Sequence, residues 1–136
     1  MAWKPSAGRE GEVHPNEDLL RREVEAAFSE EFYTDDHVLR FPGRGPLAGE
    51  YVGYAGLAEF GDKLGSRVTS LERNLLDVLA NDERGVQIID VHATRAGGAE
   101  HRWRMIWLIH IRDGRIAESS GHPDDLGALE AFFSGE

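Results

Sequence analysis

Hydrophobic residues recur at helical spacing near the start of the chain. Asn16 follows a proline and is a typical helix N-cap residue. Apolar side chains then repeat at intervals of three or four residues, at Leu19, Leu20, Val24, Ala27 and Phe28. This spacing predicts an amphipathic helix. Ser29 begins a second, short helical turn, which we expect to end at residues 33–36.

Two later segments show the same spacing. Leu57, Phe60 and Leu64 predict a helix over residues 54–66, although each of the glycines there weakens it by about 1 kcal/mol relative to alanine. Pro123-Asp124-Asp125 is typical of a helix start and precedes a C-terminal helix. The apolar stripe of that helix consists of Leu126, Leu129, Phe132 and Phe133.

The strand signals lie mostly in the second half of the chain. A brief strand over residues 37–41 ends at a loop, residues 42–46, that contains two prolines and two glycines. An antiparallel meander then follows, with strands at residues 71–79, 86–95, 101–111 and 115–121. Helices followed by long antiparallel strands predict an α+β fold, in which a curved sheet wraps around the N-terminal helices.

Alternation along the strands separates an inner from an outer face. If the Gly97–Gly98 hairpin places Arg95 opposite Ala99, Asp90 faces Arg104 and His92 faces Arg102 on the outer face. The same register collects the apolar residues inside, and it gives the inner face Gln87, Ile89, Val91, Ala93, His101, Trp103, Met105, Trp107 and Ile109. Charge pairing and burial therefore favour the same register.

The turn at residues 113–114 allows two arrangements of the last strand. A two-residue loop turns Ile116, Glu118, Ser120 and His122 inward, whereas a three-residue loop turns Ala117, Ser119 and Gly121 inward. We favour the three-residue loop, because an unpaired Glu118 in an apolar interior would be costly. The inner wall is then aromatic on one strand and small on the next. The pattern leaves open whether the resulting room holds a ligand or is filled by the helices.

Composition narrows the classes of function. The chain has 136 residues, no cysteine, and a net charge of −10 from 15 basic and 25 acidic residues. We expect a flexible tail over residues 1–15 and a single domain over 16–136. The negative charge would repel nucleic acid and anionic membranes, and no apolar run reaches about 18 residues. We therefore expect a cytoplasmic protein without nucleic-acid or membrane partners. The six histidines are scattered, so we expect no metal and no cofactor.

Four short motifs occur in order along the chain. They are Tyr33-Thr34-Asp35-Asp36, the segment 41–49 with Tyr51 and Gly53, Arg112-Asp113-Gly114-Arg115-Ile116, and His122-Pro123-Asp124-Asp125. From Leu19 to Phe133 the chain resembles the SnoaL-like branch of the nuclear-transport-factor-two-like superfamily, which also holds ketosteroid isomerases and polyketide cyclases. The resemblance implies a cystatin-like α+β barrel, that is, a cone-shaped, mostly antiparallel sheet closed by helices around a pocket. It also implies a homodimer through the outer sheet face.

The catalytic positions of the relatives are not retained. The proton-shuttling carboxylate of ketosteroid isomerases precedes the proline that is Pro42 here, and this chain has Phe41 at that position. The histidine and the acid of the related cyclases correspond to Trp107 and Gly121. Any acid or base must therefore lie elsewhere, and His101 and His37 are the catalytic candidates. His101 equally suits a position at the rim, and His37 a position in solvent.

These observations predict a small-molecule pocket protein. The first hypothesis is a cofactor-independent, isomerase- or cyclase-like enzyme that acts on a hydrophobic cyclic carbonyl or polyketide-like substrate by proton transfer. The alternative is a non-catalytic ligand-binding or dimerisation module, and a cone filled by its own side chains is a third interpretation. The candidate ligand-binding residues are Tyr33, Arg40, Phe41, Trp103, Met105, Trp107, Ser119 and Gly121.

We expect a homodimer, because Ile106 and Leu108 form an apolar centre on the outer face between Arg102, Arg104 and His110. A twofold contact between two such sheets would cover this centre. Sedimentation velocity at micromolar concentration measures the assembly state. A species of the chain mass, 15.1 kDa, would contradict the dimer.

Overall fold

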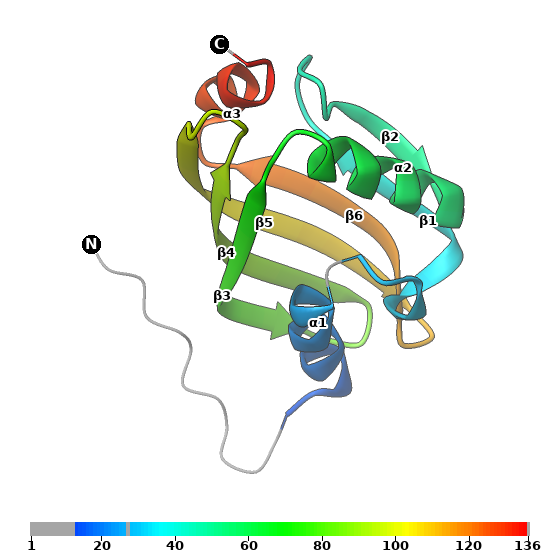
Figure 1. Ribbon diagram of the computed structural model, residues 1–136. Coiled ribbons are helices and arrows are strands. Elements are labelled where there is room, and N and C mark those ends of the chain that lie inside the picture. The colour runs from blue at the N-terminus through cyan, green and yellow to red at the C-terminus, as the bar shows by residue number, and fades with distance from the viewer. Residues whose placement is uncertain (1–12, 27, 136) are drawn as a thin grey trace.

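A curved six-stranded sheet forms the framework of residues 13–26 and 28–135, the part of the chain that this computed structural model describes (Figure 1). The elements are α1 (Pro15–Glu25), η1 (Glu30–Phe32), β1 (Tyr33–Phe41), β2 (Gly49–Val52), α2 (Gly53–Gly65), β3 (Ser70–Ala80), β4 (Arg84–Thr94), β5 (Glu100–Arg112), β6 (Arg115–Pro123) and α3 (Leu126–Phe133). The strand order is β2-β1-β6-β5-β4-β3. Only β1 and β6 run parallel among these described neighbours. The predicted α+β class and mostly antiparallel sheet are confirmed.

The helices cover separate parts of the sheet. α1 packs against β3 and β4, α2 packs against β1 and β2, and α3 contacts β5 and β6. Figure 1 shows α1 and α3 near opposite ends of the molecule. None of the described helices combines the length and the hydropathy that crossing a membrane requires.

The N-cap of α1 lies two residues before the predicted Asn16. His14 is the N-cap, and its Nδ1 accepts a hydrogen bond of 3.0 Å from the backbone N–H of Asn16. The side-chain amide of Asn16 instead donates to the carbonyls of Asn81 and Asp82, at 2.9 and 3.2 Å. Asn16 therefore ties α1 to the turn between β3 and β4. Residues 1–12 of the predicted tail lie outside the described residues.

The end of α1 also differs from the prediction. The helix ends at Glu25, and Phe28 has a left-handed φ of 61°, so Phe28 is not helical. Its backbone N–H donates to the Glu23 carboxylate at 3.1 Å, which fixes this turn. The predicted helical residue Ala27 lies outside the described residues. The predicted short helical turn after Ser29 is confirmed as η1, whose C-cap is Tyr33, where β1 begins.

The strand β2 has no counterpart in the sequence prediction. It pairs antiparallel with β1, from Val38 opposite Val52 to Phe41 opposite Gly49. This strand has only four residues, begins with glycine and runs directly into α2, so its alternation of polar and apolar residues is too short to indicate a strand. The predicted loop of residues 42–46 is confirmed, and it connects β1 to β2.

The predicted register between β4 and β5 is confirmed. Asp90 lies opposite Arg104, and His92 lies opposite Arg102. The hairpin closes where Arg95 N donates to Ala99 O at 2.8 Å. The apolar members of the predicted inner face are buried, which places the two tryptophans of β5 in the core.

The turn between β5 and β6 is a two-residue loop, so the predicted three-residue loop is wrong. Arg112 pairs directly with Arg115. Asp113 and Gly114 both have positive φ, 52° and 74°, as a type I′ turn requires. Such a turn matches the twist of the flanking strands, which explains why Asp-Gly suffices here.

A β-bulge in β6 then changes which residues face inward. The register shifts after the pair Ile111–Ile116, and Ala117 is the extra residue on β6. As a result Ile116 and Ser119 both belong to the inner face, and Glu118 stays exposed. The predicted inward positions of Ala117, Ser119 and Gly121 are buried. The bulge, and not a longer loop, turns these residues inward.

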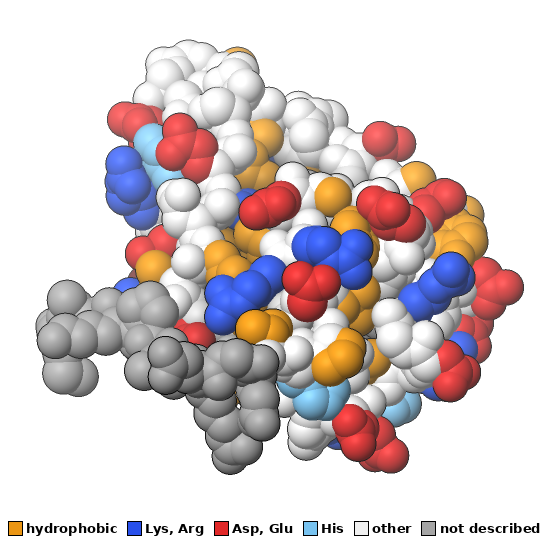
Figure 2. Space-filling model, turned by 90° about the horizontal axis from the view of Figure 1, so that it is seen from below, with side chains coloured by type: hydrophobic (Ala, Val, Ile, Leu, Met, Phe, Trp, Pro, Cys, Tyr) orange, Lys and Arg blue, Asp and Glu red, His pale blue; other side chains and the backbone are white. Residues whose placement is uncertain are grey.

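The outer face retains an exposed apolar residue. Leu108 is 49 % exposed, and its neighbour Ile106 is half-buried. This is the surface on which the predicted homodimer depends, and the dimer stays a prediction. On the face shown in Figure 2, acidic and basic side chains of the described residues are interspersed, with small apolar patches between them.

We expect Gly56→Ala to destabilise the protein and Gly61→Ala to stabilise it, although both glycines lie inside α2. A Cβ at Gly56 would lie 2.6 Å from the carbonyl carbon of Tyr51, and β2 would have to shift. Such overpacking costs about 1–3 kcal/mol. At Gly61 nothing lies within 4 Å, and alanine improves helix propensity by about 1 kcal/mol. Urea denaturation of the matched pair measures both changes, and equal stabilities would contradict this explanation.

Candidate functional site

A cavity lies between the sheet and α2, and we call it the aromatic cavity. The space open to the centres of water molecules is about 30 Å³, which is room for one or two waters. Among the described residues that line it, Arg73 alone is charged. The lining residues are Phe28, Phe41, Leu47, Phe60, Leu64, Leu71, Arg73, Val91, Trp103, Met105 and Trp107.

A buried carboxylate pairs with Arg73, the charged residue of this cavity. Glu23 of α1 is 1 % exposed. Its Oε2 accepts hydrogen bonds from the Tyr33 hydroxyl at 2.7 Å and from Phe28 N at 3.1 Å. Its Oε1 accepts from Gln87 Nε2 at 3.0 Å and lies 3.6 Å from Arg73 Nη2. Glu23, Tyr33, Arg73 and Gln87 form what we call the polar cluster.

Arg73 is the member of the polar cluster that reaches the aromatic cavity. Its side chain is 8 % exposed, and its guanidinium lies over the Phe28 ring, 4.8 Å from the centroid. Neither Nη1 nor Nη2 has a hydrogen-bond partner among the described residues. The 3.6 Å separation from Glu23 is an ion pair but too long for a hydrogen bond. Arg73 therefore brings unused donors and a positive charge to an apolar wall.

A second, smaller cavity adjoins the polar cluster. Its space for water centres is about 10 Å³, close to the minimum for one water. It shares Phe28, Arg73 and Trp107 with the aromatic cavity. Its wall also includes Ser119 of β6. The two cavities are thus neighbours, one apolar and one polar.

Tyr33 stays protonated in this setting. Burial, and then the negative charge of Glu23 beside it, raise the pKa of the Tyr33 hydroxyl well above its ordinary value. The hydroxyl is therefore a permanent donor to Glu23. Its hydrogen bond holds the Glu23 carboxylate in place within the polar cluster.

His37 lies beside the smaller cavity. It is fully buried, its Nε2 is 3.0 Å from Ser119 Oγ, and its ring meets the Tyr33 ring edge-on at 4.5 Å. Its Nδ1 has no partner within the described part of the chain. Burial lowers the pKa of His37 to about 4. His37 is therefore neutral at pH 7 and reaches the cavity only through Ser119.

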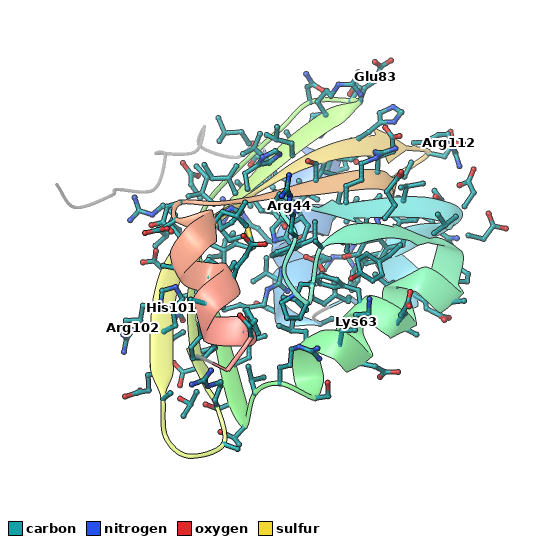
Figure 3. All side chains as sticks on the ribbon, turned by 90° about the horizontal axis from the view of Figure 1, so that it is seen from above. Arg44, Lys63, Glu83, His101, Arg102 and Arg112 are labelled. Atoms are coloured by element: carbon teal, nitrogen blue, oxygen red, sulfur yellow. The ribbon has the colours of Figure 1, made fainter. Side chains whose placement is uncertain are left out.

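The second catalytic candidate lies at the other end of the sheet. His101 stacks between Trp103 and Phe132, with ring centroids 5.5 Å from each. Figure 3 shows it beside α3, at the end of β5 opposite Arg112. Asp36, the neighbour of His37, binds Arg112. The two histidines are therefore not brought together.

The predicted ligand-binding residues divide between the two faces of the sheet. Phe41, Trp103, Met105 and Trp107 line the aromatic cavity, and Tyr33 and Ser119 line the smaller one. Arg40 lies on the outer face, where it is 3.5 Å from both Glu50 and Glu118, so it does not line either cavity.

The room predicted beside Gly121 is occupied by the protein itself. A Cβ at Gly121 would lie 3.0 Å from Cζ3 of Trp107, so the indole ring packs directly on the glycine backbone. On the inner face of the sheet, the aromatic cavity lies instead toward α2, next to Arg73. The expectation of a small wall that leaves room is wrong at this position.

Sequence reasoning missed Glu23 and Arg73, and it placed Gln87 on the inner face without a role in the site. Each occupies a position that its element's pattern turns inward. Glu23 lies on the apolar stripe of α1, Arg73 alternates with leucines in β3, and Gln87 belongs to the inner set of β4. A polar residue at an inward position on three elements at once is the signal that could have identified the cluster. Within the described ranges, no group of three or more His, Asp or Glu side chains could hold a metal ion.

Comparison with protein families assigns the chain. The model of the SnoaL-like domain matches residues 18–119. The chain belongs to the SnoaL-like family. No curated protein matches this SnoaL-like chain significantly. The predicted family resemblance is confirmed, and the match begins within α1 and ends in β6.

Solved structures show the same fold. Bal32a, from a soil-derived mobile gene cassette, is 24 % identical with a TM-score of 0.80, over 88 % of this chain and 96 % of that one. An NTF2-like protein of unknown function from Burkholderia pseudomallei K96243 is 14 % identical with a TM-score of 0.82, over 90 % and 100 % of the chains. A proposed SnoaL-like polyketide cyclase from Jannaschia sp. CCS1 is 16 % identical with a TM-score of 0.77, over 96 % and 99 %. The SnoaL-like chain thus shares their fold.

We expect His37 to make the protein less stable in mild acid. Its folded pKa of about 4 lies below the ordinary value of 6.5, so the unfolded state binds more protons between these values. Stability is complete above pH 6.5 and is lost as the pH falls towards 4. From pH 7 to pH 5 the loss is about 2 kcal/mol.

Urea denaturation of wild type and His37→Gln at both pH values measures this contribution. His122→Gln is the matched control, because His122 is exposed. The control should lose stability as the wild type does, and His37→Gln should lose about 2 kcal/mol less. An equal loss in all three proteins would exclude His37 as the source.

Proposed function

We propose that the protein binds a small, mainly apolar cyclic carbonyl compound in the aromatic cavity and transfers a proton next to the carbonyl without a cofactor. The proposal rests on the position and the unpaired donors of Arg73. Its guanidinium is buried, lines an otherwise uncharged wall, and has two nitrogens without hydrogen-bond partners among the described residues.

Buried donors without acceptors favour a ligand that supplies an acceptor. Leaving a buried polar group unpaired costs about 1–3 kcal/mol, and more when the group is charged. A carbonyl oxygen in the aromatic cavity would accept a hydrogen bond from Arg73, while the ring of the ligand would contact aromatic side chains such as Trp107. A six-membered ring is larger than this free space, so it can enter only if the side chains of the wall move apart. A monocyclic compound requires a smaller movement than a larger compound does.

The same geometry supports proton transfer. A positive charge held at the carbonyl oxygen stabilises the negative charge that forms there when a neighbouring C–H loses its proton. Ser119 lines the adjoining cavity and contacts Nε2 of the neutral His37. In the proposed reaction the Ser119 hydroxyl takes the proton and passes its own to His37. Return of the proton to the same or another carbon completes the exchange or the isomerisation.

A specific observation favours the alternative, binding without catalysis. The Glu23 carboxylate already accepts three hydrogen bonds, and the low pKa of His37, about 4, makes it a weak base. His37 is therefore not matched to neutral pH in the way that general bases are, and the carboxylate oxygens of Glu23 are already occupied. The two functions share the Arg73 anchor and differ only in the proton acceptor.

We expect cyclohexanone to bind and its α-hydrogens to exchange faster with the protein present. Ligand-observed NMR measures binding, and deuterium incorporation in D₂O measures exchange. Cyclohexane is the reference ligand without an acceptor. Replacing Arg73 alone would leave Glu23 buried without its counter-charge, so the test variant combines Arg73→Met with Glu23→Gln. It should bind cyclohexanone at least tenfold more weakly and cyclohexane equally well.

Arg40→Met is the matched control, because it removes a guanidinium from the outer face. It should bind and exchange cyclohexanone as the wild type does. Binding without faster exchange would decide for the non-catalytic alternative. Equal cyclohexanone affinity in the double variant and the wild type would overturn the Arg73 anchor.

A further inference from the structure

Trp103 is a second unpaired donor in the wall of the aromatic cavity. Its side chain lines the cavity and is 7 % exposed. Its indole Nε1 is buried and has no hydrogen-bond partner among the described residues. A tryptophan N–H usually finds a partner when it is buried. The proposed function uses Arg73 and leaves this donor unexplained.

The two donors belong to one cross-strand row. Arg73 of β3 pairs with Val91 of β4, and Val91 pairs with Trp103 of β5. Since neighbouring strands lie about 4.8 Å apart, the Cα atoms of Arg73 and Trp103 are about 10 Å apart. All three side chains line the aromatic cavity. The row therefore offers a donor on each side of an apolar centre.

We propose that Trp103 is a second polar anchor and that the ligand is a cyclic dione with carbonyl groups on opposite edges of its ring. This inference rests on the proposed function, because it assigns one carbonyl to Arg73 and the other to Trp103. Val91 then lies under the apolar middle of the ring. The dione is thus complementary to the order donor, apolar, donor along the row.

The chemistry of the wall favours carbonyl groups over hydroxyl groups. Arg73 and the indole N–H groups of Trp103 and Trp107 only donate, the sulfur of Met105 accepts weakly, and the other side chains of the wall are hydrocarbon. A carbonyl oxygen accepts a hydrogen bond and donates none. A hydroxyl could accept equally well, but its own proton would then lack an acceptor in the wall. Two acceptors without donors are therefore the complement of this site.

The test compares 1,4-cyclohexanedione with cyclohexanone, two probes that differ in the second carbonyl. Binding of each is measured by ligand-observed NMR to wild type and to Trp103→Phe, which keeps the ring but removes the N–H. Arg40→Met is the control, because it removes a side-chain donor from the outer face and leaves the wall of the aromatic cavity unchanged. Circular dichroism establishes that each variant is folded.

In the wild type the dione should bind about fivefold more tightly than the monoketone, as one added hydrogen bond provides. Trp103→Phe should remove this ratio and leave cyclohexanone binding within twofold, and Arg40→Met should keep the ratio. Equal binding of both probes by the wild type would overturn the second anchor while the proposed function stands. A ratio unchanged in Trp103→Phe would also overturn it, because the N–H would then be satisfied inside the protein. Failure of both probes to bind would instead remove the proposed function.

Discussion

The buried carboxylate of Glu23 is the constraint on which the rest of the structure depends. An ionised carboxylate inside a protein is costly unless it is paired and hydrogen-bonded. Its partners come from different parts of the fold: Tyr33 begins β1, Arg73 lies on β3, and Gln87 lies on β4. Satisfying one residue of α1 therefore fixes that helix against three strands. It also holds the guanidinium of Arg73 at the wall of the aromatic cavity, with donors to spare.

The shape of the cavity follows from how the sheet bends and what covers it. The bulge at Ala117 lets both Ile116 and Ser119 face inward, which places a hydroxyl beside the polar cluster without turning Glu118 into the core. α2 closes the cavity from the other side, and it lies close to β2 because Gly56 has no side chain. The bulge in β6 and the close approach of α2 to β2 therefore place the aromatic cavity and the smaller cavity next to each other.

The parts of the fold that follow regular strand alternation could be predicted from the sequence. The parts that depart from this alternation could not. The pairing of Asp90 with Arg104 and the burial of Trp103 follow from simple alternation and were predicted. The β6 bulge was not, because an extra residue leaves no mark on composition or spacing. The polar cluster was missed for a different reason: Glu23, Arg73 and Gln87 meet only through pairings between distant segments. The aromatic half of the site was predicted because apolar residues at inward positions need no partner.

At the positions where the family resemblance implies acids and bases, this chain has Phe41, Trp107 and Gly121. Phe41 and Trp107 extend the apolar wall of the aromatic cavity, and a buried charge is screened less than one in water. A single guanidinium then dominates the electrostatics of the aromatic cavity, and it is positive. Such a site stabilises developing negative charge on a ligand oxygen without providing a strong base of its own. In the proposed function, the selection of a ligand thus depends on Arg73, and the rate of proton transfer depends on how well Ser119 and His37 accept a proton from the ligand.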